Sequence, residues 1–326
     1  MGGDFAPQNV LAGALDALQS SDDRFEVLFV GPEELLRDGL AKIQHNTCAY
    51  RIVNATQVVD MHDGATAVMK QKKDSSIAVG ITLQTEGQAD AFVSAGHTGA
   101  VMSASTLILG RIEGVGRPTI GAFMPTEKGV CLLVDAGANV DCKPQHLYEF
   151  AVMGSIYVER MLNVQNPSIG LLSIGEERSK GNEVTLEAYQ LLSESKLNFI
   201  GNVEGRDILK GKSNIVVCDG FVGNVVLKFA EGVLDVLKTK VRRYAARGVA
   251  QKIWAGMMAG TLRSILKDFD YQEHGGVPLL GVNGVSIIGH GKSTPKAIKN
   301  MILKAEEMVR KNINGSIRDS LHMVRG

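Results

Sequence analysis

The sequence predicts an α/β protein of three layers, in which helices cover both faces of a mainly parallel sheet. Short apolar runs typical of buried strands alternate along the chain with longer stretches whose apolar residues recur at helical spacing. The 37 glycines against 8 prolines also favour many tight turns between strands and helices. A chain of 326 residues, 44% apolar and 21% charged, has the size and composition of a soluble globular protein. We expect one catalytic domain of two lobes over residues 1–326.

The first expected element is a helix over residues 8–19, which follows a glycine turn and Pro7. Its apolar face consists of Val10, Leu11, Ala14, Leu15 and Leu18. The expected strands are 24–30, 50–53, 91–93, 119–124, 129–135, 168–174, 199–203, 214–218 and 285–288. Further helices are expected from 33, over 65–70 and 75–87, from 98, over 145–163 and 183–195, from 219 past 237, over 249–268, and from 294 past 309. Residues 275–281 contain Gly and Pro and are expected to form a loop.

Five polar, glycine-bearing turns each follow an expected strand. They are residues 94–99, 135–139, 175–182, 219–224 and 289–293. In parallel α/β sheets, ligands bind at the carboxyl ends of the strands. We therefore expect the five turns to meet at one rim of the sheet and to form a site there.

The turn at 94–99 has the pattern of an anion site. Gly96 and Gly99 allow close approach of the backbone, and Thr98 adds a hydroxyl where a helix is expected to start. Unpaired N–H groups and the helix dipole favour negative charge at such a position. The same residues also suit an ordinary helix cap at a tight turn. Neither a Walker A loop nor a G-x-G-x-x-G pattern is present, so a nucleotide is not specifically implied.

The expected rim is rich in hydrogen-bond donors but lacks an obvious nucleophile. The sequence has no G-x-S-x-G motif. The cysteines lack zinc spacing, and a carboxylate next to Cys218 disfavours its thiolate, so we interpret the cysteines as buried thiols in a reducing compartment. The polar residues of the rim are His97, Thr98, Asn139, Lys180, Asn182, Asp219, Asn224, His290 and Ser293. The asparagines also suit turns or caps, and Lys180 an exposed loop charge.

Charge is distributed unevenly along this formally neutral chain. Residues 236–267 contain eight Lys or Arg and no Asp or Glu. The helix expected over 249–268 carries an apolar stripe, including Trp254 and Met257, beside these cations, and suits either a dimer interface or a tip that touches lipid. We therefore expect a basic and apolar helical protrusion at about 236–270. There is no signal peptide or apolar run of 18 residues, and the low aromatic content, 5%, argues against a nucleic-acid platform.

Taken together, these loops resemble a known family. The stretches MGGDFAP, SAGHTGAVMSAS, RPTIGAFMPT, LLVDAGAN, IGEERSKGNE, CDGFVGNVVLK, GGVPLLGVNG and GHGKS are similar to those of the phosphate acyltransferase family PlsX of bacterial phospholipid synthesis. The resemblance covers essentially the whole chain. It implies transfer of a fatty acyl group from acyl-[acyl carrier protein] to inorganic phosphate, which gives acyl phosphate for phosphatidic acid synthesis.

The resemblance also implies a fold similar to isocitrate and isopropylmalate dehydrogenases and to phosphotransacetylase. It implies a homodimer without cofactor or metal, located in the cytoplasm and attached to the inner face of the cell membrane. A membrane glycerol-3-phosphate acyltransferase of the PlsY type is then an expected partner. Two departures from the family pattern stand out: the strand that usually precedes Met-Gly-Gly-Asp is absent, which weakens the sheet next to that turn, and His97 occupies a position that is commonly Asn.

Phosphate is itself a nucleophile, so this reaction needs positioning and aimed donors. We expect phosphate to bind at Gly96, His97, Thr98 and Gly99 together with Lys180. The oxyanion candidates are Asn139, Asn182 and Asn224, and His290 is the candidate that protonates the departing thiolate. The candidate substrate contacts are Gly3, Asp4, Asn139 and Asp219.

Three other functions remain open from the sequence. A phosphotransacetylase-like enzyme acting on acyl-CoA would use almost the same chemistry. An NAD-linked hydroxyacid dehydrogenase would need clustered carboxylates for a divalent metal, which we do not find in the sequence. A non-catalytic membrane scaffold would have no need for the polar turns.

Overall fold

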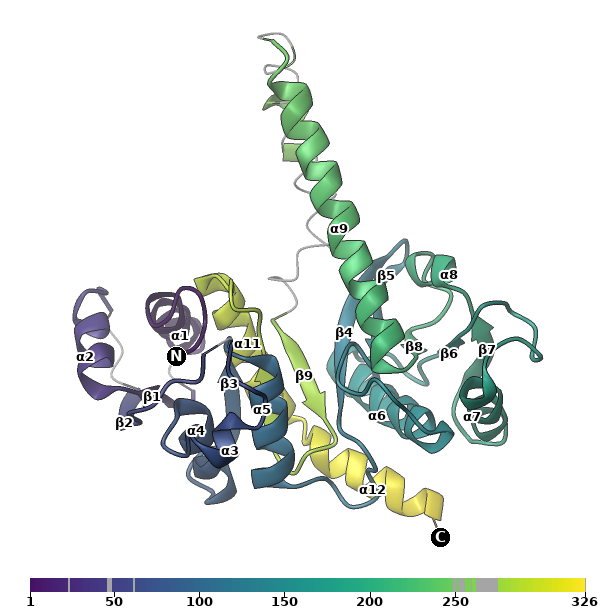
Figure 1. The fold of residues 1–326 in the computed structure, drawn as a ribbon, viewed down its shortest axis with the longest axis horizontal. Helices are drawn as coiled ribbons and strands as arrows, with labels where there is room; N and C mark the ends of the chain where they lie inside the picture. Colours follow the sequence, from purple (N-terminus) through teal and green to yellow (C-terminus); the bar gives the residue numbers. More distant parts are fainter. Residues whose placement is uncertain are drawn as a thin grey trace.

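The computed structural model describes residues 1–22, 24–45, 49–60, 62–248, 251, 256–258, 260–261 and 275–325 (Figure 1). The strands are β1 (Val27–Gly31), β2 (Tyr50–Asn54), β3 (Ala91–Ser94), β4 (Thr119–Thr126), β5 (Gly129–Val134), β6 (Ile169–Leu172), β7 (Phe199–Val203), β8 (Ile215–Val217), β9 (Val277–Leu280) and β10 (Val285–Ile288). The helices are α1 (Gln8–Ser20), α2 (Glu33–Ala41), α3 (Ala67–Lys70), α4 (Ser76–Thr85), α5 (Thr98–Ala104), the π-helical turn η1 (Ser105–Leu109), α6 (Pro144–Leu162), α7 (Glu183–Ser193), α8 (Gly205–Leu209), α9 (Gly220–Ala245), α11 (Pro295–Arg310) and α12 (Ile313–Arg325).

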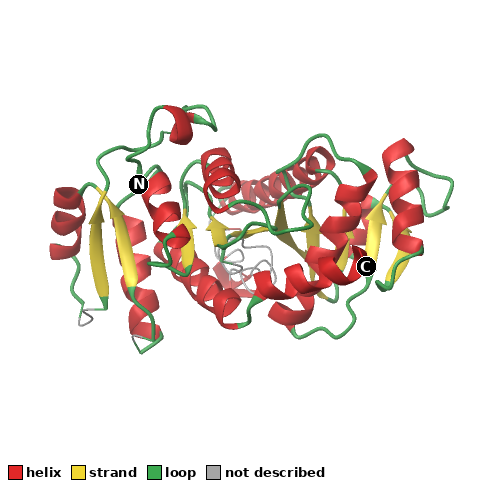
Figure 2. Cartoon of the chain, turned by 90° about the horizontal axis from the view of Figure 1, so that it is seen from below, coloured by secondary structure: helices red, strands yellow, loops and turns green. Residues whose placement is uncertain are grey.

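Eight strands form one sheet in the order β3-β10-β9-β4-β5-β8-β6-β7, and β1 and β2 form a separate parallel pair. Four of the seven neighbouring pairs in the large sheet are parallel, whereas β9 and the β4–β5 hairpin introduce antiparallel pairs. Figure 2 shows helices on both sides of this row of strands. The predicted three-layer α/β fold with a mainly parallel sheet is confirmed.

The main core surrounds α6. Residues 147–154 of this helix are all buried, as expected of a helix that is covered on every side. Its Phe150 and Tyr157 belong to an apolar cluster that also includes Leu132 of β5, Ile215 of β8 and Met301 of α11. Complete burial of one such side chain contributes about 1.5–3 kcal/mol, so this cluster fixes the strands that carry the polar turns.

The prediction of a loop at residues 275–281 is wrong, because residues 277–280 form strand β9. Gly275 and Gly276 have φ of +64° and +67° and turn the chain into the strand. Pro278 lies opposite Ile287 of β10, while Leu279 and Leu280 pair with β4. Pairing on both sides outweighs the unfavourable strand propensity of Gly and Pro.

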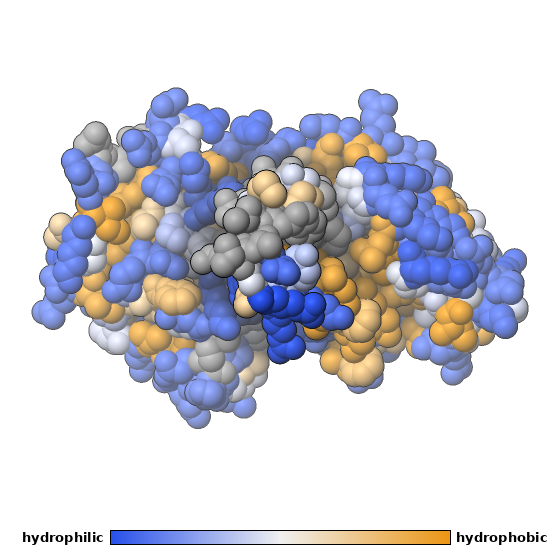
Figure 3. Space-filling view, turned by 90° about the horizontal axis from the view of Figure 1, so that it is seen from above, coloured by the Kyte–Doolittle hydropathy of each residue, from blue (hydrophilic) through white to orange (hydrophobic). Residues whose placement is uncertain are grey.

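Helix α9 projects away from the body of the molecule (Figure 1). Its exposed apolar side chains include Phe221, Val225 and Phe229, of which Phe229 is 72% exposed. The predicted helix over 249–268 lies largely outside the described residues, Trp254 included, whereas Met257 is helical and exposed. Figure 3 looks down on this projection and shows strongly hydrophilic residues in front of an apolar surface. Every helix in the described part of the chain is too short or too polar to cross a bilayer.

A cavity of about 600 Å³ separates β1 from β3. Residues 24–30 and 88–95 line it, together with residues of α1, α4 and α11. In the described part of the chain, neither β1 nor β3 has a strand paired on the side that faces this cavity. The β1–β2 pair is therefore separate from the large sheet beside the Gly2-Gly3-Asp4 turn.

Candidate active site

Three turns lie in direct backbone contact and form what we call the first turn group: residues 1–4, 94–99 and 289–293. The Gly289 N–H donates to the Ser94 carbonyl at 2.8 Å, and the Asp4 N–H donates to the Gly291 carbonyl at 2.9 Å. A Cβ on Gly3 would lie 2.8 Å from the Ala95 carbonyl oxygen, so only glycine fits between the other two turns. The structure thus brings together the predicted residues near Gly3, Gly96 and His290.

His97 caps helix α5. Its Nδ1 accepts a hydrogen bond from the Ala100 N–H at 3.1 Å, and its Nε2 lies 2.9 Å from the Asp63 carbonyl oxygen. This pattern requires the tautomer with hydrogen on Nε2. Both ring nitrogens are therefore engaged in structure, which agrees with a position where Asn, also a good cap, is common. Thr98, one residue later, is exposed.

A second turn group consists of residues 135–139 and 219–224. The Asp135 carboxyl, which is fully buried, accepts hydrogen bonds from the N–H groups of Gly137, Ala138 and Asn139 at 2.8–3.0 Å. Burial raises the pKa of Asp135, and these hydrogen bonds act in the opposite direction. The carboxyl therefore holds the whole turn in one conformation.

Asn139 uses its side-chain amide inside the protein. The Nδ2 group donates to Asp135 Oδ2 and to the Pro118 carbonyl, both at 2.8 Å. Both hydrogens of the Asn139 amide are therefore used in these two bonds. Of the three asparagines that the sequence predicted, Asn182 and Asn224 donate no hydrogen bond from Nδ2 to any residue in the described part of the chain, so these two remain the oxyanion candidates.

Helix α9 begins directly against the 135–139 turn. Asp219 caps it by accepting from the Val222 N–H at 2.8 Å, and the Gly220 N–H donates to the Asn139 carbonyl at 2.7 Å. The Asn224 side chain is exposed, and its Cγ would lie 3.5 Å from a Cβ on Gly137. Asn224 thus lies beside the turn and is exposed to solvent.

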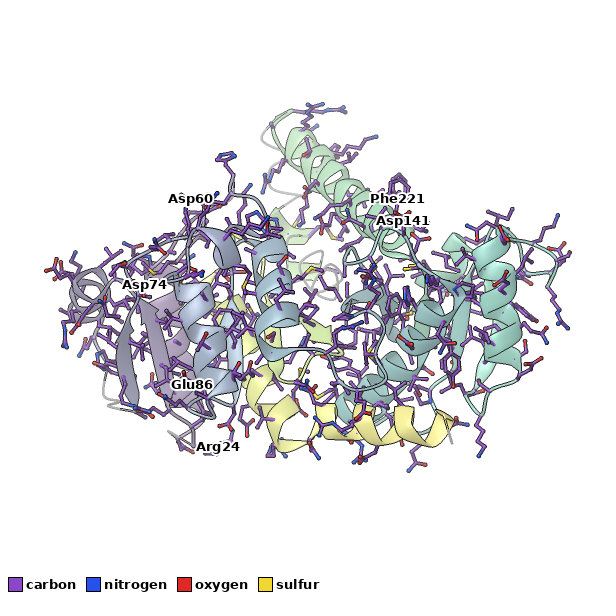
Figure 4. All side chains as sticks on the ribbon, turned by 60° about the horizontal axis from the view of Figure 1, so that its bottom comes forward. Arg24, Asp60, Asp74, Glu86, Asp141 and Phe221 are labelled. Atoms are coloured by element: carbon purple, nitrogen blue, oxygen red, sulfur yellow. The ribbon has the colours of Figure 1, made fainter. Side chains whose placement is uncertain are left out.

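One apolar cluster joins the two turn groups. It contains Val101 and Ala104 of α5, Ile288 before the 289–293 turn and Ala136 of the second group, with Leu227 of α9 packed against it. In Figure 4, Asp60, from the segment beside His97, and Asp141 and Phe221, beside the second group, lie along the same edge of the molecule.

The loop 175–182 is held by its own set of contacts. The Lys180 carbonyl accepts from Ser173 Oγ, Glu176 pairs with Lys212 at 2.8 Å, and Asn182 caps α7 by accepting from the Thr185 N–H at 2.9 Å. The Lys180 side chain is exposed. The cap that the sequence left open for Asn182 is therefore present, whereas the caps by His97 and Asp219 were not among the predictions.

The prediction of a single rim of parallel strands is wrong. Strands β3 and β10 run antiparallel to β5, β8 and β6, because β9 and the β4–β5 hairpin reverse the direction of the chain between the halves of the sheet. The turns after β3 and β10 therefore follow strands of one direction, and those after β5, β6 and β8 follow strands of the other. The first and second turn groups come together through packing around the shared apolar cluster and not through a common strand direction.

The cysteines are unsuited to nucleophilic chemistry. Burial raises the pKa of Cys131 to about 12, and burial and neighbouring carboxylates raise the pKa of Cys142 to about 12. The Cys218 thiol donates to the Asp135 carbonyl, and its pKa is raised by burial and by Asp135. Cys48 lies outside the described residues. The described part of the chain contains no group of three His, Cys, Asp or Glu that could hold a metal ion.

Comparison with known proteins agrees with these loops. A family model described as a fatty acid synthesis protein matches residues 1–316. The phosphate acyltransferase of Desulforudis audaxviator (strain MP104C) is 48% identical over 325 residues, covering 100% of this chain and 95% of that protein. The chain belongs to the phosphate acyltransferase family. The family member of Pelotomaculum thermopropionicum is 46% identical over 99% of this chain and 94% of its own. The protein is therefore an acyltransferase of fatty acid and phospholipid synthesis.

Solved structures support the fold of this phosphate acyltransferase family member. A phosphotransacetylase from Streptococcus pyogenes matches with a TM-score of 0.63 at 18% identity, over 93% of this chain and 92% of that one. The EutD phosphotransacetylase from Staphylococcus aureus matches with a TM-score of 0.57 at 15% identity, over 92% and 99%. At these identities the similarity is one of fold.

Sequence reasoning missed several residues that shape the site. Asp135 carries the 135–139 turn, and its signal was available, because an acid placed between a buried strand and a Gly turn suits a turn acceptor. Asp63 contacts His97 from a segment 34 residues away, and Asn202 contacts the Lys180 loop from β7. Nothing in the local pattern marks these two.

Proposed function

We propose that the protein transfers a fatty acyl group from acyl-[acyl carrier protein] to inorganic phosphate. The observation that carries the proposal is the pair of turn groups along one edge, which present donors without an activated nucleophile. A phosphate oxygen forms a bond to the thioester carbonyl carbon, the C–S bond breaks, and the thiolate takes a proton. The products are acyl phosphate and the free carrier thiol. Membership of the phosphate acyltransferase family supports this reaction.

Phosphate binding is assigned to the first turn group. The backbone N–H groups of Gly96, His97, Thr98 and Gly99 and the Thr98 hydroxyl donate to phosphate oxygens, and Lys180 supplies a positive charge. Gly3 and Asp4 lie against this group and are assigned to substrate contact. His97 contributes its backbone, because both ring nitrogens are engaged.

Stabilisation of the oxyanion is assigned to side-chain amides. Asn224, exposed beside the 135–139 turn, and Asn182, whose Oδ1 caps α7, have Nδ2 groups that could donate to the developing charge. Asp219 and Asn139 shape this part of the site. The proton transfer is assigned to His290, whose Nδ1 accepts from the Lys292 N–H at 3.1 Å and whose Nε2 therefore carries a hydrogen. His290 acts as a relay: hydrogen phosphate gives up its proton as acyl phosphate forms, and the departing thiolate takes one up, so the ring ends neutral.

We further propose that the enzyme is a cytoplasmic homodimer attached peripherally to the inner face of the cell membrane. The exposed apolar side chains of α9 and its basic residues support both contacts. Acyl phosphate then passes to a membrane glycerol-3-phosphate acyltransferase of the PlsY type. Changing Trp254 and Met257 to Ser is expected to reduce recovery on anionic vesicles while the dimer persists, and unchanged recovery would contradict lipid contact by this tip.

A second candidate is a phosphotransacetylase-like enzyme that uses acyl-CoA. The fold similarity to phosphotransacetylases favours it, and only the thiol carrier differs. A non-catalytic membrane scaffold is the third reading, and the polar turn groups count against it.

The deciding experiment measures release of free thiol from palmitoyl-acyl carrier protein and from palmitoyl-CoA, with and without phosphate. We expect phosphate-dependent release from the carrier protein. Release from CoA alone would favour the second candidate. No release from either substrate by the folded protein would refute the catalytic proposal.

A further inference from the structure

A buried asparagine in β7 holds the loop that carries Lys180. Asn202 is 4% exposed, and its Nδ2 group donates to the Glu177 carbonyl at 2.9 Å and to the Lys180 carbonyl at 3.4 Å. Ser173, which follows β6, donates its hydroxyl to the same Lys180 carbonyl at 3.0 Å. The backbone of Lys180 is therefore held from two neighbouring strands.

Asn202 is an unfavourable choice for the interior of a strand. Its Oδ1 is buried and has no hydrogen-bond partner in the described part of the chain. An unpaired buried acceptor costs stability, and an apolar β-branched residue would fill a buried strand position without that cost. A residue that breaks a local rule in this way often serves a site, and here the bonds it does make lead to the loop.

On its solvent side the loop is held by side chains, because Glu176 pairs with Lys212 at 2.8 Å and the Arg178 guanidinium donates to Gln190 Oε1. Residues 176–180 are all exposed, and a single backbone bond, from the Lys180 N–H to the Glu177 carbonyl at 3.0 Å, closes the turn between them. The Asn202 amide binds the carbonyls at both ends of this turn, those of Glu177 and Lys180. The position of the Lys180 backbone thus depends on Asn202 and Ser173.

We propose that Asn202, assisted by Ser173, is a positioning residue that fixes Lys180 for phosphate binding. The inference rests on the role of Lys180 given under the proposed function. A lysine ammonium ends a flexible stem, so its contribution to binding requires a fixed backbone. Loss of the hydrogen bonds from Asn202 and Ser173 to the Lys180 carbonyl then weakens phosphate binding more than it slows the chemical step.

The test compares Asn202→Ala with Asn198→Ala, a matched control in which another asparagine side chain loses its hydrogen bond. Asn198 precedes β7, and its amide donates to the Asn166 carbonyl at 2.9 Å, away from the loop. We expect Asn202→Ala to raise the phosphate KM about tenfold with kcat within about twofold, and Asn198→Ala to change neither. Ser173→Ala, a milder change, is expected to raise the phosphate KM about threefold and serves if Asn202→Ala does not fold.

A double-mutant cycle with Lys180→Ala separates positioning from general structure. We expect Asn202→Ala to have no further effect on the phosphate KM once Lys180 is removed. An equal increase in both backgrounds, or a lower kcat and Tm with an unchanged phosphate KM, would overturn the proposal. A wild-type protein without phosphate-dependent activity would instead refute the proposed function.

Discussion

Replacing Gly223 with Ala tests how closely α9 packs on the 135–139 turn. Gly223 is buried in the first turn of α9, and a Cβ there would lie 1.8 Å from the Asp135 carbonyl oxygen and 3.0 Å from Cys218 Sγ. Because real Cβ atoms keep at least 3.0 Å from such neighbours, the helix or the turn must move by about 1.2 Å or more. The nearest atom is backbone, so rotation of a side chain does not relieve the contact.

Two energetic effects of this substitution oppose each other. Ala favours a helix over Gly by about 1 kcal/mol, whereas overpacking against a rigid neighbour costs about 1–3 kcal/mol or more. A displacement above 1 Å against backbone makes overpacking the larger effect. We expect the free energy of unfolding to fall by about 2 kcal/mol and kcat/KM to fall about a hundredfold, since Asn224 shifts with the helix.

Urea unfolding and phosphate-dependent thiol release measure these two quantities. The matched control is Gly232→Ala in the same helix, where a Cβ meets nothing within 4 Å. This control is expected to gain up to about 1 kcal/mol of stability and to keep its kcat/KM. If Gly223→Ala behaved like Gly232→Ala in both assays, the reasoning about this contact would be refuted.

Two further predictions concern other parts of the molecule. Replacing His97 with Ala removes the cap of α5 and should lower the free energy of unfolding by about 1 kcal/mol. Replacing it with Asn keeps an acceptor and should lower this free energy by less. Urea unfolding of both variants measures the difference, and equal losses of stability would argue against the cap. Burial lowers the pKa of Lys304 from 10.5 to about 7. Between these pH values the unfolded chain binds more protons than the folded chain, so the free energy of unfolding should rise with pH. Lys304→Met should abolish that rise between pH 7 and pH 9, and an unchanged dependence of the unfolding free energy on pH would contradict the prediction.

Much of the local structure followed from the sequence. The strand at 91–94, the helix start at Thr98 and the long helices α6 and α9 were all predicted near their observed bounds. These features depend on apolar periodicity and turn residues within about ten positions of each other, and such patterns are visible in a single sequence. The cap by Asn182 was likewise among the alternatives, because a short polar side chain before a helical pattern has few other local uses. The cap by Asp219 was not predicted.

What only the tertiary structure decided were the contacts between distant segments. Gly3 lies between Ala95 and Gly291, and Asn202 of β7 contacts Lys180 in the loop that follows the neighbouring strand β6. Strand β9 forms against its local propensity because β4 and β10 pair with it on both sides. The sequence by itself determined which turns carry polar groups, but the direction of each strand, and so which turns meet, depended on long-range pairing and on packing around one apolar cluster. Those energies are set by residues far apart in the chain, and no local pattern contains them.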